Sequence, residues 1–229
     1  MWYEPIFKDR RIAGRELAVG LDEFANRDDV VVLALPRGGV PVAHEVAEEL
    51  RAPLDVFIVR KLGVPGQEEL AFGAIATGGV TVLNDSVLRA LNMPDELLKK
   101  VVQREQIELK RREEIYREGR APIDLNGKTV IVIDDGLATG ATMSAAVKAL
   151  QELGPQMIVV AVPVASQSAC DELDSQTNVR SICLATPEPF YGVGMWYRDF
   201  SQTTDTEVQE LLSASRKRTA GKYNKAGAN

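Results

Sequence analysis

Apolar runs of strand length recur along this chain, and most lead through a glycine-containing turn into a helical pattern. The runs are nearly continuous in Val, Ile, Leu and Ala, which is typical of strands buried on both faces of a parallel sheet. They occupy residues 30–35, 54–59, 129–133, 157–164 and 179–184. Strands that alternate with helices predict an α/β fold, a mostly parallel twisted sheet flanked by helices, with ligands at the carboxyl ends of the strands.

Helical periodicity follows several of these runs. One stripe with the helical period consists of Val42, Ala43, Val46, Ala47 and Leu50. A second helix is predicted over residues 142–153, and a short one follows the fourth run. Residues 94–118 are densely charged and open with Pro94, Asp95 and Glu96, types favoured in a first helical turn, so they predict one long inserted helix. It either covers the sheet as a solvated helix or packs against a partner.

The C-terminal part differs in composition. Residues 186–200 are unusually aromatic for a chain with 6% aromatic residues. Thr204 and Glu207 have the spacing of a capping box, which predicts a last helix to about Ser213. Residues 214–229 are rich in Gly, Ala and Lys without periodicity, and we predict a disordered basic tail there. We predict a single domain over residues 1–213. Its core lies at about 30–185, with the inserted helix at about 94–118 and a C-terminal segment at about 186–213.

Composition and charge restrict the class of protein. The chain has 229 residues and a formal net charge of −6. Its 45% hydrophobic and 26% charged residues are typical of a globular protein and exclude disorder of the whole chain. Five Lys and Arg residues and no acids follow Leu212, so the rest of the chain carries −11 and makes a poor surface for nucleic acid. The tail is then the obvious basic candidate for such binding.

Histidine and cysteine are scarce. His44 is the single histidine, without a metal-ligand or triad pattern around it, so we predict a structural role. Cys170 and Cys183 lack the spacing of a metal site or a disulfide framework, and we expect two core thiols, typical of a reducing cytosol. The N-terminus lacks a signal-peptide pattern, and no apolar stretch approaches the roughly 20 residues of a membrane span. These features predict a soluble, cytoplasmic protein with no membrane partner.

Residues 130–143 carry the strongest chemical pattern. A strand delivers Asp134 and Asp135 to its carboxyl end, and a loop of small and hydroxyl residues leads from them into a helix. The turn before the helix consists of Thr139, Gly140, Ala141 and Thr142. Its backbone N–H groups and hydroxyls converge at a helix N-terminus, which suits a phosphate monoester, while the two carboxylates suit the hydroxyls of a sugar diol. The segment therefore predicts a cradle for a 5-phosphoribosyl group.

This segment resembles the phosphoribosyl-pyrophosphate (PRPP) binding motif of type I phosphoribosyltransferases, in the form closest to the adenine phosphoribosyltransferases. Two β-branched apolar residues, two acids and the TGxT turn stand in one register, which is far more specific than a glycine pattern. Residues 35–43 (LPRGGVPVA) take the place of the family's pyrophosphate loop, and residues 59–66 (VRKLGVPG) that of the start of its mobile loop. Alone, each of these two also fits an ordinary turn after a strand. The resemblance covers about residues 30–185.

The resemblance implies transfer of ribose 5-phosphate from PRPP to a nitrogen nucleophile, with inversion at C1′ and release of pyrophosphate. Catalysis then depends on charge placed on the leaving group, on Mg²⁺ bound through PRPP, and on exclusion of water. Asp134 and Asp135 are expected to bind the ribose hydroxyls and to contact Mg²⁺ directly or through water. Arg60 and Lys61 are expected to neutralise the pyrophosphate. The expected PRPP-binding residues are Arg37, Gly38, Gly39, Asp134, Asp135, Gly136, Leu137, Ala138, Thr139, Gly140, Ala141 and Thr142.

The sequence departs from some members of the family. The 6-oxopurine enzymes carry an acid just before the TG turn, where this chain has Ala138, which counts against hypoxanthine or guanine but not against adenine or uracil as acceptor. The adenine enzymes carry a glutamate in the mobile loop, and Glu68 and Glu69 lie near that place without clean alignment, as candidate general acids. The long helix and the FKDR-x-x-AG start at residues 7–14 resemble instead a group of predicted phosphoribosyltransferases with a long inserted helix.

A hood formed from the ends of the chain caps the acceptor pocket in this family, which corresponds here to residues 186–213. Phe190, Trp196 and Tyr197 are candidates for stacking on a flat base, and Asp199 for reading its edge. The aromatic residues of this segment fit equally well a role in attaching it to the core.

The leading hypothesis is a Mg²⁺-dependent phosphoribosyltransferase of nucleotide metabolism, expected to be a homodimer, that acts on a nucleobase-like acceptor. The alternative is a regulatory protein that keeps the fold as a sensor of PRPP or nucleotides and binds RNA, DNA or a protein partner. Arg60, Lys61 and the pyrophosphate loop favour the enzyme, because a sensor can lose the leaving-group machinery. A third hypothesis, an interaction module assembled through the long helix, is compatible with either.

Overall fold

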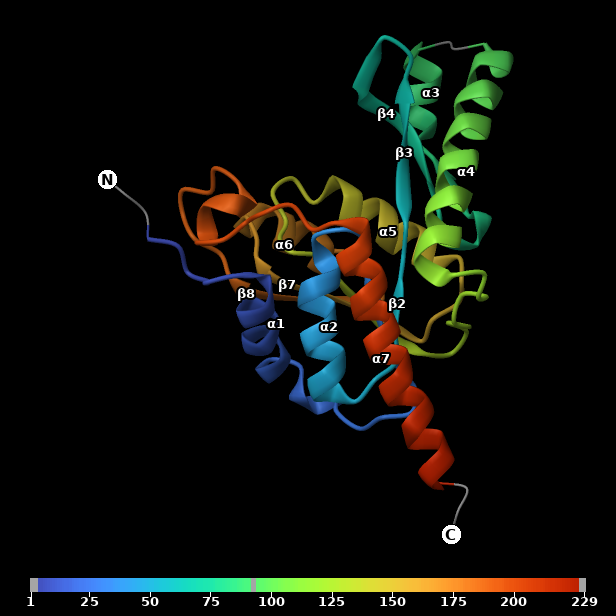
Figure 1. Ribbon diagram of the computed structural model, residues 1–229. Coiled ribbons are helices and arrows are strands. Elements are labelled where there is room, and N and C mark those ends of the chain that lie inside the picture. Colours follow the sequence, from blue (N-terminus) through green and yellow to red (C-terminus); the bar gives the residue numbers. More distant parts are fainter. Residues whose placement is uncertain (1–3, 92–93, 227–229) are drawn as a thin grey trace.

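A five-stranded parallel sheet forms the centre of the protein (Figure 1). The computed structural model describes residues 4–91 and 94–226. The strand order is β2 (Leu54–Val56), β1 (Val30–Ala34), β6 (Thr129–Ile133), β7 (Met157–Val164) and β8 (Val179–Ala185). Ala34 at the end of β1 pairs with Ile133 at the end of β6, so the loops that follow these strands emerge side by side. The predicted α/β fold is confirmed.

Helices cover both faces of this sheet (Figure 1). α1 (Arg10–Val19), α2 (Gly39–Leu50) and α7 (Asp205–Ala226) lie on one face, and α5 (Ala141–Gln151) and α6 (Gln167–Asp174) lie on the other. Within β1, Val30 and Val32 are buried with the first group, whereas Val31 and Leu33 are buried with the second. Successive side chains of a strand point to opposite faces, so the continuous apolar run reflects two buried faces.

A smaller antiparallel sheet projects from this body together with the long helix (Figure 1). We call the projection, residues 59–117, the flap. It consists of β3 (Val59–Val64), β4 (Gln67–Ala76), β5 (Thr81–Leu83), α3 (Asp85–Leu91) and α4 (Asp95–Arg117). Three short 3-10 helices lie at Asp22–Phe24, Thr77–Gly79 and Val193–Trp196.

The run predicted as one strand at residues 54–59 divides between the two sheets. The Phe57 N–H still donates to the Ala34 carbonyl of the central sheet at 2.9 Å, but the Ile58 N–H donates to the Thr77 hydroxyl of the flap at 3.0 Å. Both Phe57 and Ile58 are buried, so the apolar pattern continues across the point where the chain changes sheets. The single-strand prediction was wrong for that reason.

The predicted long helix is confirmed as α4, and it lies along the flap and the body of its own chain. Val101 and Leu109 of α4 are buried in the same apolar cluster as Phe72 of β4. In its last turn, Arg117 forms a buried ion pair with Asp55 of β2, with Nε 3.0 Å from Oδ2. The helix therefore covers strands, which is the first of the two interpretations of its charged sequence.

The C-terminal helix runs farther than the sequence pattern predicts. α7 continues to Ala226, where we expected an end near Ser213 and a disordered tail, so that prediction was wrong. Two ion pairs attach the extension to the body, Arg216 to Glu118 at 3.0 Å and Arg218 to Glu48 at 2.6 Å. Both partners are remote in sequence, and the tail's own composition gives no sign of them. The last three positions of the predicted tail lie outside the described residues.

The two cysteines form a disulfide between α6 and β8 rather than two free thiols. The fold brings the Cα atoms of Cys170 and Cys183 to 6.7 Å, within the span of a disulfide. The prediction of core thiols was wrong because spacing along the chain does not report this proximity. The inference of a reducing environment, which rested on free thiols, loses its basis.

Residues near the N-terminus pair with the segment that follows β8. We call residues 186–213 together with residues 6–9 the hood. Phe7 pairs with Tyr197 in a parallel bridge, and the Phe7 N–H donates to the Trp196 carbonyl at 2.9 Å. The side chains of these three residues are buried in one aromatic cluster. The N-terminal segment therefore supports the C-terminal one.

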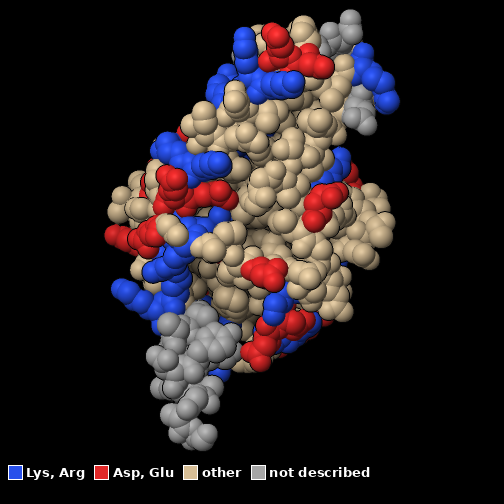
Figure 2. Space-filling view, turned by 90° about the vertical axis from the view of Figure 1, so that its right-hand side faces the viewer, with Lys and Arg blue, Asp and Glu red and all other residues tan. Residues whose placement is uncertain are grey.

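Charges of both signs are mixed on the surface. Figure 2 shows Lys and Arg side chains interspersed with Asp and Glu around a neutral area, without an extended patch of one sign on that face. That face therefore offers no broad basic surface to nucleic acid. Among the described helices, none is both long and apolar enough to cross a bilayer.

Candidate functional site

The carboxyl end of β6 carries two adjacent aspartates. Asp134 and Asp135 follow Ile133, and the Asp135 N–H donates to Asp134 Oδ1 at 2.8 Å. Burial raises the pKa of Asp134 well above its usual range, and the neighbouring Asp135 charge raises it further. Burial also raises the pKa of Asp135, but the Arg10 guanidinium opposes that rise. The pair therefore favours a state in which Asp135 carries the charge and Asp134 retains a proton to higher pH.

We predict that Asp134→Asn stabilises the ligand-free protein at neutral pH. A carboxyl whose pKa is raised by folding contributes most below its unfolded pKa, and that contribution is lost as the pH rises through the folded pKa. Asparagine keeps the oxygen that accepts the Asp135 N–H but carries no charge. Thermal unfolding at pH 7 should give a Tm higher by about 2 °C or more, and the difference should shrink as the pH falls toward 4. A lower Tm at pH 7 would contradict the raised pKa.

Arg10, at the start of α1, holds the Asp135 carboxylate. Its Nε and Nη2 each lie 2.8 Å from Asp135 Oδ2, and its Nη1 donates to the Ser201 carbonyl at 2.7 Å. The guanidinium carbon lies 3.9 Å from the centroid of the Phe200 ring, a cation–π contact. The Tyr197 hydroxyl donates to the Asp135 carbonyl at 2.6 Å. Arg10 and the hood together fix the position of Asp135.

Arg10 was not among the site residues predicted from the sequence. It lies 125 positions from Asp135, and no spacing rule connects residues that far apart. The one available signal was the FKDR-x-x-AG start, which was noticed as a resemblance and given no role.

The predicted pyrophosphate loop packs directly against the two aspartates. A Cβ on Gly39 would lie 2.6 Å from the Ile133 carbonyl and 2.9 Å from Asp134 Cα, and a Cβ on Gly38 would overlap the Asp135 carboxylate. The peptide bond between Pro36 and Arg37 is cis. The Arg37 side chain turns toward α7, with Nη1 3.8 Å from Asp205 Oδ1. The structure thus places both glycines beside the aspartates, whereas the Arg37 guanidinium pairs with the last helix.

The predicted phosphate loop leads from the aspartates into α5. The Leu137 N–H donates to the Val164 carbonyl, and the Ser166 hydroxyl donates to the Ala138 carbonyl at 2.8 Å, which ties the loop to the end of β7. Gly140 has φ +67°, a conformation that favours glycine, and as the N-cap residue it offers α5 no side-chain cap. The Thr139 hydroxyl accepts the Ala141 N–H in a long contact of 3.5 Å. Thr139, Ala141 and Thr142 are exposed. The N-terminus of α5 therefore presents backbone N–H groups to solvent, as an anion site requires.

Gly136 lies between the aspartates and the hood. A Cβ there would come within 2.6 Å of the Val193 side chain and 2.9 Å of the Val164 carbonyl. The absence of a side chain at this position thus allows the hood to approach the strand ends.

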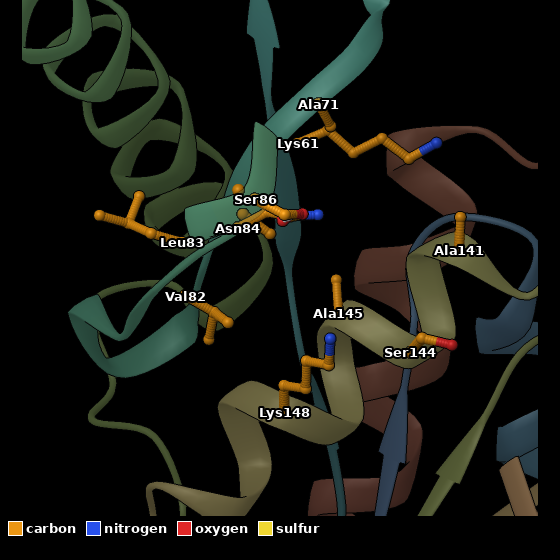
Figure 3. Close-up of a pocket in the computed structure, with 12 residues that line it drawn as sticks. Lys61, Ala71, Val82, Leu83, Asn84, Ser86, Ala141, Ser144, Ala145 and Lys148 are labelled. Atoms are coloured by element: carbon orange, nitrogen blue, oxygen red, sulfur yellow. Dashed lines mark hydrogen bonds between the residues drawn. The ribbon is translucent and has the colours of Figure 1, made fainter. Parts of the chain in front are cut away.

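Arg60 and Lys61 point to opposite faces of the flap. Arg60 Nη2 lies 2.6 Å from Glu105 Oε2 of α4, which keeps it away from the aspartates. Lys61 instead extends over the first turn of α5 near Ala141 (Figure 3). Adjacent residues of a strand face opposite ways, so the structure does not bring these two side chains together. Of the pair, Lys61 is the one placed to meet an anion at the α5 N-terminus.

We predict different effects for the two adjacent substitutions. Lys61→Ala should lower kcat/KM for PRPP by about 10- to 100-fold, the usual range for loss of one hydrogen bond to a charged group. Arg60→Ala should instead destabilise the flap by breaking its pair with Glu105, with at most a fewfold change in kcat at a temperature where the protein is folded. Steady-state kinetics and thermal unfolding of both variants measure this split. Equal losses of kcat would contradict the assignment.

The four residues predicted to form the acceptor pocket do not line one cavity. Trp196 and Tyr197 are each 4% exposed and belong to the aromatic cluster of the hood, so they serve attachment. Asp199 lines a cavity of about 230 Å³ together with Arg10. Phe190 lines a larger one of about 630 Å³. The other residues around this larger cavity are Ser166, Gln167, Ser168, Pro187, Glu188 and Pro189.

Three further candidates are placed as follows. His44 lies on α2, away from the strand ends, and burial lowers its pKa, in keeping with the predicted structural role. Glu68 and Glu69 belong to β4, but their side chains are outside the described part of the structure. Whether either acts as a general acid stays a prediction.

The strand ends of this parallel sheet combine an acidic pair, a tight glycine loop and a helix N-terminus, an arrangement that suits a phosphorylated sugar. The phosphoribosyl transferase domain family matches residues 6–191, and the chain belongs to this family.

Relatives agree with this assignment. The chain is 48% identical over 207 residues to a candidate phosphoribosyl transferase of Mycobacterium tuberculosis, a match that covers 90% of this chain and 46% of that protein. The chain thus spans about half the length of these curated relatives. Over 129 residues it is 35% identical to the bifunctional protein PyrR of Chloroflexus aurantiacus, covering 55% of this chain and 65% of that protein. The crystal structure of TT1426 from Thermus thermophilus superposes with a TM-score of 0.79 at 43% identity, covering 90% of this chain and 97% of that one.

Proposed function

We propose that this chain transfers ribose 5-phosphate from PRPP to a nitrogen atom of a nucleobase-like acceptor and releases pyrophosphate. One observation carries the proposal: the three segments expected to contact PRPP meet at a single edge of the sheet. Gly39 of the pyrophosphate loop packs against Asp134 of the aspartate pair. The phosphate loop that follows the aspartates continues directly into the N-terminus of α5. This order along the edge matches a pyrophosphate, a ribose and a 5′-phosphate in sequence.

The bond between C1′ and the pyrophosphate oxygen breaks in the proposed reaction, a C1′–N bond forms on the opposite face, and the acceptor nitrogen loses a proton. Positive charge develops on the ribose ring as pyrophosphate leaves. Arg10 keeps Asp135 ionised. The Asp135 carboxylate stabilises the positive charge on the ribose ring and accepts a hydrogen bond from a ribose hydroxyl. Backbone N–H groups of the phosphate loop hold the 5′-phosphate, and Lys61 meets the same phosphate from the flap side.

Magnesium fits this site as a cation that PRPP brings with it. No cluster of three or more His, Cys, Asp or Glu side chains that could hold a metal occurs among the described residues. The two aspartates supply oxygen donors, the type that Mg²⁺ prefers, yet Asp135 is already paired with Arg10. We therefore assign most of the coordination to PRPP, and Asp134 would contribute as a carboxylate, with the Mg²⁺ charge taking the place of its proton. When bound, Mg²⁺ neutralises charge on the leaving pyrophosphate.

The cavity beside Phe190 is the proposed acceptor site. It lies where α6 begins and β8 ends, and Ser166 at its wall also bonds the phosphate loop. A base bound there is close to the loop that holds the ribose 5-phosphate. Ala138 precedes the TG turn, so the acceptor is expected to be adenine- or uracil-like rather than a 6-oxopurine.

The proposal is tested by incubating the protein with PRPP, Mg²⁺ and a panel of nucleobases while measuring pyrophosphate release. We expect base-dependent release with wild type, none with Asp135→Asn, and none without Mg²⁺. Release no faster than background with every base, together with PRPP affinity unchanged in Asp135→Asn, would overturn the proposal. The regulatory alternative predicts salt-dependent binding to RNA or DNA. The pairing of Arg216 and Arg218 with the body leaves α7 with fewer unpaired cations for that role.

A further inference from the structure

A cavity runs from the N-terminus of α5 between the flap and the flank of this helix (Figure 3). Its volume is about 490 Å³, which is the size of a small-molecule pocket. From α5 it is lined by Ala141, Ser144, Ala145 and Lys148, whose spacing of three to four residues forms one stripe along the helix. The opposite wall comes from β3, β4, β5 and the residues that follow β5.

Two lysines place positive charge at this cavity. Figure 3 shows Lys61 reaching from the flap over the start of α5, and Lys148 projecting from α5 on the same side of the helix. Neither ammonium forms an ion pair with a carboxylate of the described residues, and no described lining residue is acidic. Two unpaired ammonium groups around a cavity attract a ligand with about two negative charges, such as a phosphate ester.

The rest of the lining suits an uncharged, partly apolar body. Val82, Leu83 and Ala145 provide apolar surface. Asn84, whose Oδ1 accepts the Ser86 hydroxyl at 2.6 Å, adds an amide from the flap side (Figure 3). An amide and hydroxyls can donate to and accept from the edge of a heterocycle. Charge and lining together describe a phosphorylated molecule of nucleotide size.

One end of this cavity meets the proposed PRPP site at Ala141 and Lys61, and the other end, at Lys148, lies beyond that site. Lys148 lies seven residues after Ala141, which corresponds to about 10 Å along a helix. A 5′-phosphate at the α5 N-terminus therefore leaves the Lys148 end of the cavity free. Lys61 lies between the two, so a ligand in the cavity would also fix the flap against α5.

We propose that this cavity is a second anion site, which binds a phosphorylated small molecule of nucleotide size through Lys148 and Lys61 and ties the flap to α5. The proposal does not depend on the transfer reaction.

Calorimetric titration of AMP, ATP and GTP into protein kept at saturating PRPP and Mg²⁺ tests it, because PRPP occupies the strand-end site. We expect at least one nucleotide to bind under these conditions. Lys148→Glu should weaken that binding by at least about 10-fold, the effect of reversing a contacting charge, and Ala145→Phe should block it by filling the cavity. Lys100→Glu, on the exposed side of α4, is the matched control and should leave nucleotide binding unchanged. All three variants should bind PRPP with the affinity of wild type.

The proposal is wrong if none of the three nucleotides binds PRPP-saturated protein at millimolar concentration, or if Lys148→Glu and Ala145→Phe bind as wild type does. Failure of PRPP itself to bind would instead contradict the proposed transfer reaction. The dependence of nucleotide binding on Lys148 remains measurable in that case, so the two failures are distinguishable.

Discussion

Gly39→Ala is expected to lower kcat/KM for PRPP by at least about 100-fold, the cost of displacing a positioned group by about 1 Å. The new Cβ would lie 2.6 Å from the Ile133 carbonyl and 2.9 Å from Asp134 Cα, both part of the backbone at the end of β6. That backbone is held in the middle of the sheet by β1 and β7, so the glycine loop has to move instead. The free energy of unfolding should fall by about 2 kcal/mol, as for an overpacked core.

Gly192→Ala is the matched control for this substitution. Gly192 lies in the hood, its backbone is extended, and a Cβ there would meet no atom within 4 Å. Its kinetics and stability should stay close to wild type. Chemical denaturation and initial rates of pyrophosphate release measure both variants. Wild-type kinetics in Gly39→Ala would show that the loop does not contact PRPP.

Arg10→Met is expected to lower the free energy of unfolding by about 3 kcal/mol, the usual cost of removing one partner from a buried ion pair. The Arg10 and Asp135 side chains are 12% and 15% exposed, so water cannot fully replace the lost contacts. Without Arg10, burial of Asp135 is unopposed and its pKa rises. A protonated Asp135 accepts the ribose hydroxyl and stabilises the developing charge on the ribose less well, so kcat/KM for PRPP should fall roughly 10-fold. The loss should be greatest at pH values between the Asp135 pKa in wild type and its higher pKa in the variant.

Two control variants distinguish the positioning of Asp135 by Arg10 from a nonspecific loss of stability. Arg11→Met removes a neighbouring cation of α1 that is 51% exposed and lies 3.6 Å from Glu45, and it should change stability by no more than about 0.5 kcal/mol. Arg10→Lys keeps the charge and should restore part of the PRPP affinity and of the pH profile. A pH profile of kcat/KM that is the same in Arg10→Met and wild type would contradict the role assigned to Arg10.

The elements that the sequence predicted well are those whose signal is local. β1, β6 and β7 were found from continuous apolar runs, and α4 from its first-turn residues and charge. The aspartate pair and the phosphate loop were found because they follow each other directly along the chain. Local periodicity and turn chemistry are sufficient for such segments.

What the sequence could not predict depends on contacts between distant positions. The switch of sheets after Phe57 occurs inside an apolar run and is decided by a hydrogen bond to Thr77. The fold alone creates the proximity of several residue pairs. These pairs are the disulfide, the ion pair that attaches the end of α7 to the body, and the ion pair between Arg10 and Asp135. The flap strands carry few alternating apolar residues, and for this reason Arg60 and Lys61 were first assigned one common role.

The edge formed by Gly39, Asp134, Asp135 and the start of α5 is the proposed binding site for PRPP. Calorimetric titration of PRPP with Mg²⁺ into wild type and Asp135→Asn tests it most directly. One PRPP per chain should bind wild type, and Asp135→Asn should bind at least about 10-fold more weakly, since it loses a charge-assisted hydrogen bond to the ribose. Absence of binding to folded wild type, or equal affinity of the two proteins, would contradict the claim.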